Sequence, residues 1–120
     1  MDAIQSIYLD VNDPSVSENI LYGKQGDGGS RRIRVNLTEN GAPFVIPEGV
    51  RVSFRYLMPN GTGCDDSPVV RKEDSLEVEL PEVMLAIPGA VIADLCLEDS
   101  VGGRLSTPSF VIRVEPFPCA

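Results

Sequence analysis

Histidine and tryptophan are absent from this sequence of 120 residues, and aromatic residues make up only 6% of it. Without histidine the chain has no Ser-His-Asp or Cys-His catalytic set and no histidine-based zinc site. This absence excludes most familiar hydrolases. The shortage of aromatic residues also disfavours a carbohydrate-binding module, because such modules usually present exposed aromatic side chains to sugar rings.

Cysteine is scarce as well, with an odd count of three, Cys64, Cys96 and Cys119, and no CxxC spacing. The sequence therefore predicts reduced thiols and neither a disulfide framework nor a zinc knuckle. Cys64 precedes Asp65 and Asp66, and adjacent carboxylates disfavour the reactive thiolate. No acidic segment has the DxDxDG spacing of a calcium loop. We accordingly predict no enzyme and no catalytic, metal-binding or cofactor-binding residue.

The sequence also lacks a run of about 18 apolar residues that could span a bilayer. Its N-terminus carries Asp2 and Asp10 and has no basic region of the kind that opens a signal peptide. The formal net charge is −8, with 18 acidic and 10 basic residues. Such a chain repels phosphate backbones and anionic lipids. We expect a protein that is made and kept in the cytoplasm, or assembled there into something larger, with neither nucleic acid nor membrane as a partner.

What the sequence does have is apolar residues that alternate with polar ones. An apolar fraction of 42% and a charged fraction of 23% are typical of a globular protein, and the length fits a single domain over residues 1–120. Period two dominates and period 3.6 is almost missing, which indicates strands. The alternating runs cover residues 7–11, 33–38, 50–58, 76–80, 91–98 and 110–115.

Turn residues separate these runs. Asn40-Gly41 and Asn60-Gly61 are typical of tight type I′ hairpin turns, and Gly102-Gly103 has a similar place between the last two runs. Pro81–Ile87 is expected to form one short helical turn. Six to eight short strands in a chain of this length predict an all-β fold, an antiparallel, immunoglobulin-like β-sandwich. The first strand, residues 4–11, is the expected free edge of a sheet.

The stretch GKQGDGGS invites comparison with a phosphate-binding loop. Its Gly23-Lys24 pair opens the loop, however, whereas a phosphate cradle places lysine at its end, before a helix. A strand follows here, which also excludes a dinucleotide fingerprint. We therefore predict a structural loop that crosses from one sheet to the other, with Asp27 or Ser30 bonded to loop backbone. The loop residues are Gly23, Gln25, Gly26, Asp27, Gly28 and Gly29.

Arginines form the one basic cluster of this acidic chain. Alternation places Arg32 and Arg34 on one strand face, and we expect Arg51 or Arg55 of a neighbouring strand beside them. These four arginines are predicted to bind a carboxylate-rich protein partner. Protection of an exposed sheet from edge-to-edge pairing is the alternative reading.

The order of turns and strands resembles the N-terminal domain of the phage baseplate upper protein family. Residues 25–27 give its Q-G-D segment, residues 40–43 its N-G-x-P hairpin, residues 52–61 its V-x-F-x-x-x-x-P-x-G strand and turn, and residues 106–114 its S-T-x-x-F-x-I-x-V strand. The likeness extends over residues 22–116. It contains no catalytic residue that could be carried over to this chain.

The resemblance implies a structural protein of a phage or prophage tail that anchors receptor-binding machinery to the tail tip. Its partners would be other tail and baseplate proteins, and the family likeness also allows a homo-oligomer. The expected location is the virion tail, and the bacterial cytoplasm during assembly. Two alternatives remain at this point: a carbohydrate-binding or adhesin-like sandwich, and an unrecognised enzyme that uses Cys64 or a pair of acidic residues.

Overall fold

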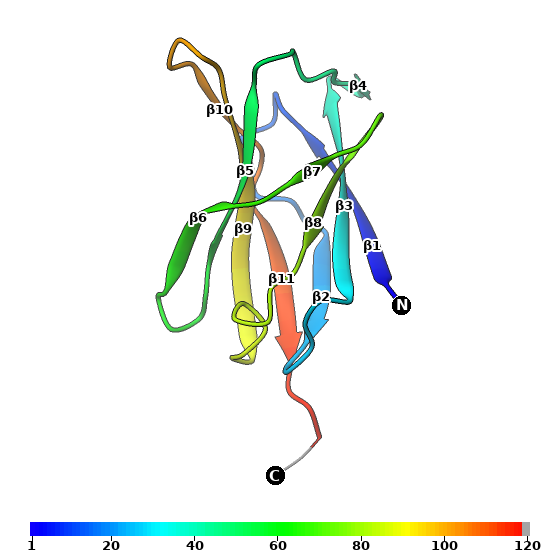
Figure 1. Ribbon diagram of the computed structural model, residues 1–120, viewed down its shortest axis with the longest axis vertical. Helices are drawn as coiled ribbons and strands as arrows, with labels where there is room; N and C mark the ends of the chain where they lie inside the picture. Colours follow the sequence, from blue (N-terminus) through cyan, green and yellow to red (C-terminus); the bar gives the residue numbers. More distant parts are fainter. Residues whose placement is uncertain (119–120) are drawn as a thin grey trace.

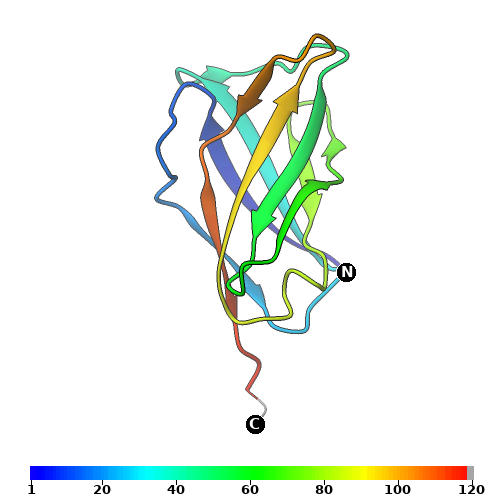
Figure 2. The same ribbon diagram turned by 90° about the vertical axis from the view of Figure 1, so that its left-hand side faces the viewer.

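The computed structural model describes residues 1–118 as two β-sheets packed face to face, with overall dimensions of 49 × 27 × 24 Å. Figure 1 views the two sheets edge-on, and Figure 2 looks onto the outer side of one of them. The eleven strands of this part of the chain are β1 (Ala3–Asp10), β2 (Ile20–Lys24), β3 (Arg31–Glu39), β4 (Ala42–Pro43), β5 (Arg51–Leu57), β6 (Gly63–Ser67), β7 (Val70–Arg71), β8 (Leu76–Glu79), β9 (Gly89–Glu98), β10 (Arg104–Ser106) and β11 (Phe110–Glu115).

The five-stranded sheet has the order β1-β3-β8-β7, with β4 also paired to β3. The six-stranded sheet has the order β2-β11-β9-β5-β6, with β10 also paired to β9. The predicted all-β sandwich is therefore confirmed. The six alternating runs of the sequence correspond to β1, β3, β5, β8, β9 and β11. The structure has more strands than the predicted six to eight, largely because β4, β7 and β10, with two or three residues each, were not predicted.

Both sheets are mixed rather than purely antiparallel. β1 pairs with β3 in parallel, and β2 pairs with β11 in parallel, whereas the other pairs are antiparallel. A tight hairpin enforces antiparallel pairing, but no hairpin joins either parallel pair. The chain passes from β1 into β2 of the opposite sheet before it returns to β3. Residues 4–11 do supply an edge strand, since β1 pairs with β3 alone.

The core lies between the sheets and is formed by the inward side chains of each alternating strand. Phe54 of β5 and Phe110 of β11 are fully buried, and their ring centroids are 6.4 Å apart. Ile33 and Val35 of β3 meet them from the other sheet with no exposed surface. Burial of each such side chain contributes about 1.5–3 kcal/mol. The alternation that predicted the strands is thus also the pattern of core burial.

Residues 81–87 form no helix. They make successive turns instead, in which the amide of Met84 donates to Pro81 O at 3.0 Å and that of Leu85 donates to Glu82 O at 3.1 Å. The expected helical turn is absent because the backbone bonds within this segment are all of the i→i+3 type, and Pro88 has no N–H with which to continue them. Met84 and Leu85 are nevertheless fully buried.

The predicted type I′ turn is present at one of the two Asn-Gly pairs. Asn40 and Gly41 have φ of 51° and 87°, as that turn requires. At the second pair only Gly61 has a positive φ, of 86°, so a type I′ turn there was a wrong prediction. Gly61 N donates to Met58 O, and Met58 N donates to Thr62 O. This is a type I turn followed by a glycine bulge, which suits Pro59 at its second position.

One side chain joins the edge strand β1 of the five-stranded sheet to the edge strand β2 of the six-stranded sheet. Gln5 of β1 donates from Nε2 to Tyr22 O of β2, and its Oε1 accepts from Tyr22 N at 2.9 Å. Gln5 shares the inward phase of Ile7 and Leu9. A glutamine at an inward position of a strand was the sequence signal for this contact, and it was not recognised as one.

Candidate functional site

The described residues contain no group of three or more side chains placed to hold a metal ion. Within the same residues there is no helix with the length and apolarity needed to cross a membrane. Cys64 and Cys96 are free thiols, and Cys119 lies outside the described residues. The candidate functional features are therefore the predicted glycine loop, the predicted arginines and the outer faces of the sheets.

The glycine loop crosses from β2 of the six-stranded sheet to β3 of the five-stranded sheet, as predicted. Gly23, which lies in β2 and not in the loop as predicted, and Gly28 of the loop occupy places where a side chain would collide with residues 82–85. A Cβ at Gly23 would lie 2.6 Å from Leu85 Cδ2, and one at Gly28 would lie 2.9 Å from Glu82 Cβ. Close packing therefore accounts for these two glycines.

Backbone and side-chain hydrogen bonds fasten the same loop to the turn at residues 82–86. Gln25 Nε2 donates to Ala86 O at 3.1 Å, and Gly26 N donates to Leu85 O at 3.3 Å. Gly26 has a φ of 86°, in the left-handed region that favours glycine. The Q-G-D segment thus joins two loops at one end of the sandwich.

Asp27 acts differently from the prediction. Its Oδ2 accepts from Arg31 Nε at 2.7 Å, so the side chain binds an arginine of the next strand rather than loop backbone. The backbone carbonyl of Ser30 accepts from Ala3 N at 2.7 Å and begins the pairing of β1 with β3. Both contacts fix the point at which the chain enters the five-stranded sheet.

The four predicted partner-binding arginines do not form one cluster. Arg32 and Arg34 lie on β3 of the five-stranded sheet, whereas Arg51 and Arg55 lie on β5 of the six-stranded sheet. The prediction of a shared face was wrong because equal alternation does not reveal which strands are neighbours. β3 lies between β1 and β8, and β5 lies between β9 and β6.

Arg32 and Arg34 face carboxylates across the strand pair β3–β8. Arg32 Nη2 lies 3.8 Å from Glu79 Oε1, and Arg34 Nη2 lies 4.0 Å from Glu77 Oε2. Asp2 Oδ1 also lies 3.6 Å from Arg32 Nε. Ion pairs at such distances contribute little stability. Opposite charges nevertheless balance along the outer face of the five-stranded sheet.

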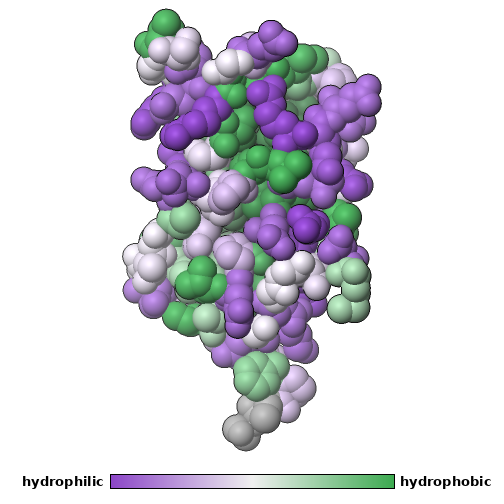
Figure 3. Space-filling model, in the orientation of Figure 1, coloured by the Kyte–Doolittle hydropathy of each residue, from purple (hydrophilic) through white to green (hydrophobic). Residues whose placement is uncertain are grey.

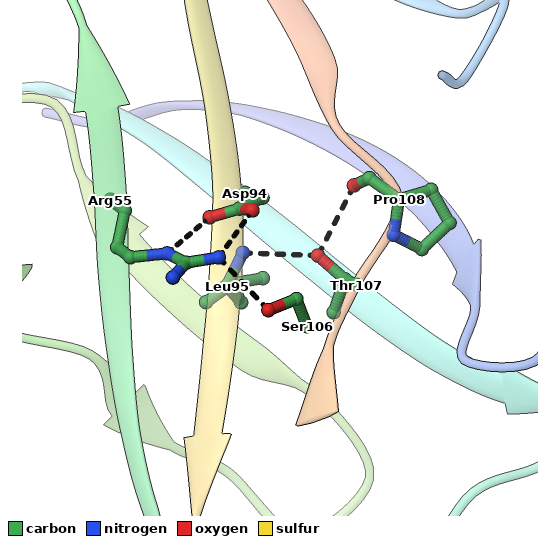
Figure 4. Close-up of polar contacts among 6 residues, drawn as sticks. All are labelled: Arg55, Asp94, Leu95, Ser106, Thr107 and Pro108. Carbon is green, nitrogen blue, oxygen red and sulfur yellow. Dashed lines mark hydrogen bonds and ion pairs between the residues drawn. The ribbon is translucent and has the colours of Figure 1, made fainter. Parts of the chain in front are cut away.

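Arg55 takes part in a tighter arrangement, shown in Figure 4. Its Nε and Nη2 donate to Asp94 Oδ1 and Oδ2 of β9 at 2.7 and 2.6 Å, and Nη2 also donates to Ser106 Oγ at 3.0 Å. The hydrogen bonds to Asp94 raise the pKa of Arg55. Asp94 is an acidic residue within the mostly apolar sequence of β9. An acid at such a position was the sequence signal for a carboxylate that is paired with a basic side chain.

Thr107 holds the junction of β10 and β11 against β9. Its Oγ1 accepts from Leu95 N at 3.0 Å, its backbone N donates to Leu95 O at 2.9 Å, and its Oγ1 donates to Pro108 O (Figure 4). Across the junction the register moves from Ser106 opposite Cys96 to Phe110 opposite Ala93. The segment from β10 to β11 therefore contains one residue more than the part of β9 opposite it, which is a β-bulge. The hydrogen bonds of Thr107 lie at this bulge.

Hydrophobic side chains reach the surface between the two sheets. Figure 3 shows them as a central band with hydrophilic residues on either side. A cleft of about 200 Å³ lies between them, with Leu37, Phe44 and Leu76 among its lining residues. Arg71 at its rim donates to Ile46 O and Val50 O, both at 3.2 Å, and thereby fixes the loop that borders it.

The model of the BppU N-terminal domain, the N-terminal domain of the baseplate upper protein, matches residues 3–117. The chain belongs to this family. Among solved structures, the N-terminal domain of phage TP901-1 ORF48 is similar, with a TM-score of 0.71 and 23% sequence identity over 93% of this chain and 98% of that chain. At this identity the likeness concerns the fold. A comparison with curated proteins found no match.

Family membership makes this BppU N-terminal domain a structural component of a phage tail baseplate. The resemblance that the turns and strands suggested is thereby confirmed. A location in the virion tail and contacts with other tail proteins follow from the same membership. The family is a structural one and not typically enzymatic.

Proposed function

We propose that this BppU N-terminal domain anchors receptor-binding machinery to the tail tip through contacts with other baseplate proteins. Membership of the baseplate family over residues 3–117 is the observation that carries the proposal. The build of the domain supports it, since both loops and edges are fastened by direct bonds such as those of Gln5 and Gln25. A body with well-fixed surfaces suits a part that holds other proteins in position.

A carbohydrate-binding role finds no support in the placement of the two exposed tyrosines. Tyr8 lies on the outer face of the five-stranded sheet and Tyr22 on that of the six-stranded sheet, so these two exposed rings do not form one platform. Phe54 and Phe110 are buried in the core. An exposed aromatic surface for sugar rings would need rings that lie side by side.

Deletion of the gene from the phage or prophage that encodes the chain tests the anchoring role. We expect the mutant to assemble tails that lack receptor-binding protein and no longer adsorb to host cells, and wild-type chain supplied in trans to restore both. Mass spectrometry of purified tails measures the content of receptor-binding protein, and an adsorption assay measures the function. Tails that keep their full content of receptor-binding protein without this chain would contradict the proposal.

A further inference from the structure

An apolar row crosses the outer face of the six-stranded sheet. It consists of Ile20 of β2, Val111 of β11, Ile92 of β9 and Leu57 of β5. The register places Val111 opposite both Ile20 and Ile92, and places Ile92 opposite Leu57. Residues opposite one another on neighbouring strands lie within side-chain contact distance. The four side chains therefore form one continuous strip, which we call the apolar row.

The apolar row is exposed although a sheet face in water is normally polar. Ile20, Ile92 and Leu57 keep 49%, 49% and 48% of their surface exposed, and Tyr22, next outward on β2, keeps 49%. In Figure 2 no described segment passes in front of β5, β9 and β11. The row and Tyr22 together expose on the order of 400 Å², the size of the largest apolar patch on a typical monomer, which is often a functional one.

A hollow beside the apolar row provides room for an inserted side chain. It has a volume of about 200 Å³, and Leu57 and Ile92 line its apolar side. Arg55 and Asp94, with Ser109, line its polar side. The two bonds between Arg55 and Asp94 keep this polar wall in place. The hollow is shallow and open to solvent, so it would receive the tip of one partner side chain.

The charged residues that flank the apolar row balance one another. Arg55 pairs with Asp94 on one side, and on the other Arg113 Nε lies 3.4 Å from Glu115 Oε1. Lys24 is opposite Glu115 in the register. The row thus has flanks of nearly equal positive and negative charge, although the chain carries a net charge of −8. Such a surface is complementary to an uncharged apolar ridge rather than to a strongly charged one.

We propose that the apolar row docks an uncharged apolar ridge of another baseplate protein; this inference rests on the proposed baseplate function. A second copy of this chain fits less well. Two copies would each bring a charge of −8, and like-charged bodies repel.

Footprinting of assembled tails tests the location of the contact. Tails from the encoding phage and the isolated chain are labelled with a photoactivated diazirine, and labelling of Leu57 and Ile92 is compared with that of Ile4 and Tyr8. The second pair is exposed on the outer face of the five-stranded sheet. We expect several-fold protection of Leu57 and Ile92 in tails and none of Ile4 and Tyr8. Equal labelling of Leu57 and Ile92 in tails and isolated chain, or protection of Ile4 and Tyr8 instead, overturns the inference while the baseplate role stands. Tails that do not contain the chain overturn both.

Substitutions test the chemistry of the partner. We expect Ile92→Lys and Ile92→Glu each to lower incorporation into tails by about tenfold or more, a change equivalent to about 1.4 kcal/mol. Ile4→Lys and Ile4→Glu are the matched controls and should incorporate normally. Thermal melts confirm folding, and Leu57→Lys replaces any Ile92 variant that does not fold. Normal incorporation of the row variants, or loss with glutamate but not with lysine, contradicts an uncharged ridge. A dimer of the isolated chain that Ile92→Lys dissociates identifies a second copy instead.

Discussion

The side-chain amide of Gln5 bonds to both backbone polar groups of Tyr22 and so joins β1 of one sheet to β2 of the other. An unpaired edge strand is a template for pairing with other chains. At Tyr22 the amide of Gln5 takes the place of a neighbouring strand. The two sheets are thus linked by hydrogen bonds between their edge strands β1 and β2 as well as by the core.

Replacement of Gln5 by leucine should expose the Tyr22 amide. We expect a loss of about 0.5–1.5 kcal/mol in the free energy of unfolding, the net value of a typical hydrogen bond, and faster hydrogen exchange at Tyr22. Gln5→Glu is the matched control, because its carboxylate still accepts from Tyr22 N while the donor is lost. Unchanged exchange at Tyr22 in the leucine variant would show that the bond is not formed in solution.

Substitutions of different glycines in the loop should lower the free energy of unfolding by different amounts. Gly28→Val must displace the backbone at Glu82, and we expect a loss of about 2–3 kcal/mol, as for other overpacked sites. Gly26→Ala meets open space but keeps a φ of 86°, which costs roughly 1–2 kcal/mol. Thermal melts measure both.

Gly63→Ala is the control for the loop glycines, because its Cβ would make only ordinary contacts. It should leave the melting temperature nearly unchanged. Equal stability of the Gly28→Val variant and the wild type would refute close packing of this loop on residues 82–85.

The pair of Arg55 and Asp94 should be energetically coupled. In a double-mutant cycle of Arg55→Gln and Asp94→Asn we expect a coupling of about 1 kcal/mol, because the bonding is bidentate and partly buried. The cycle of Arg34→Gln and Glu77→Gln is the control, since those groups lie 4.0 Å apart and Arg34 is more exposed. Its coupling should be near zero. Urea unfolding measures both cycles, and equal coupling in the two would contradict the difference in geometry.

Asp10 should make the domain sensitive to acid. Hydrogen bonds from the backbone of Asn12 and then of Gly41 lower the pKa of Asp10 below its usual 3.8. A carboxylate with a lowered pKa in the folded state stabilises the fold above the unfolded pKa, and this stabilisation disappears as pH falls through the folded pKa. We expect Asp10→Asn to be less stable than wild type at neutral pH, with the difference shrinking below pH 3.8. Urea midpoints across this pH range measure it, and a constant difference would exclude the linkage.

The main strands could be predicted because alternation is a local signal. β3 and β9 each carry their inward residues at every second position, and no other part of the chain is needed to see this. Pairing partners could not be predicted in the same way. Nothing in the sequence around β1 indicates that its neighbour is the parallel strand β3 rather than β2.

The same limit explains the errors and omissions at the surface. Arg34 and Arg55 have the same phase within their own strands, yet those strands belong to different sheets. The apolar row could not be predicted from the sequence for a related reason. Leu57 is a single apolar residue among the polar outward positions of β5, and Ile92 lies between Ala90 and Asp94 on the outward side of β9. Only the register brings the two side chains together.

The parallel pairing of β2 with β11, and of β1 with β3, has a mechanical consequence. A pull directed along β1 or along β11 draws that strand past its parallel neighbour. The ladder bonds run across the strands and therefore share the load in shear instead of opening one after another. β1 and β11 would therefore each resist a load applied along their own axes.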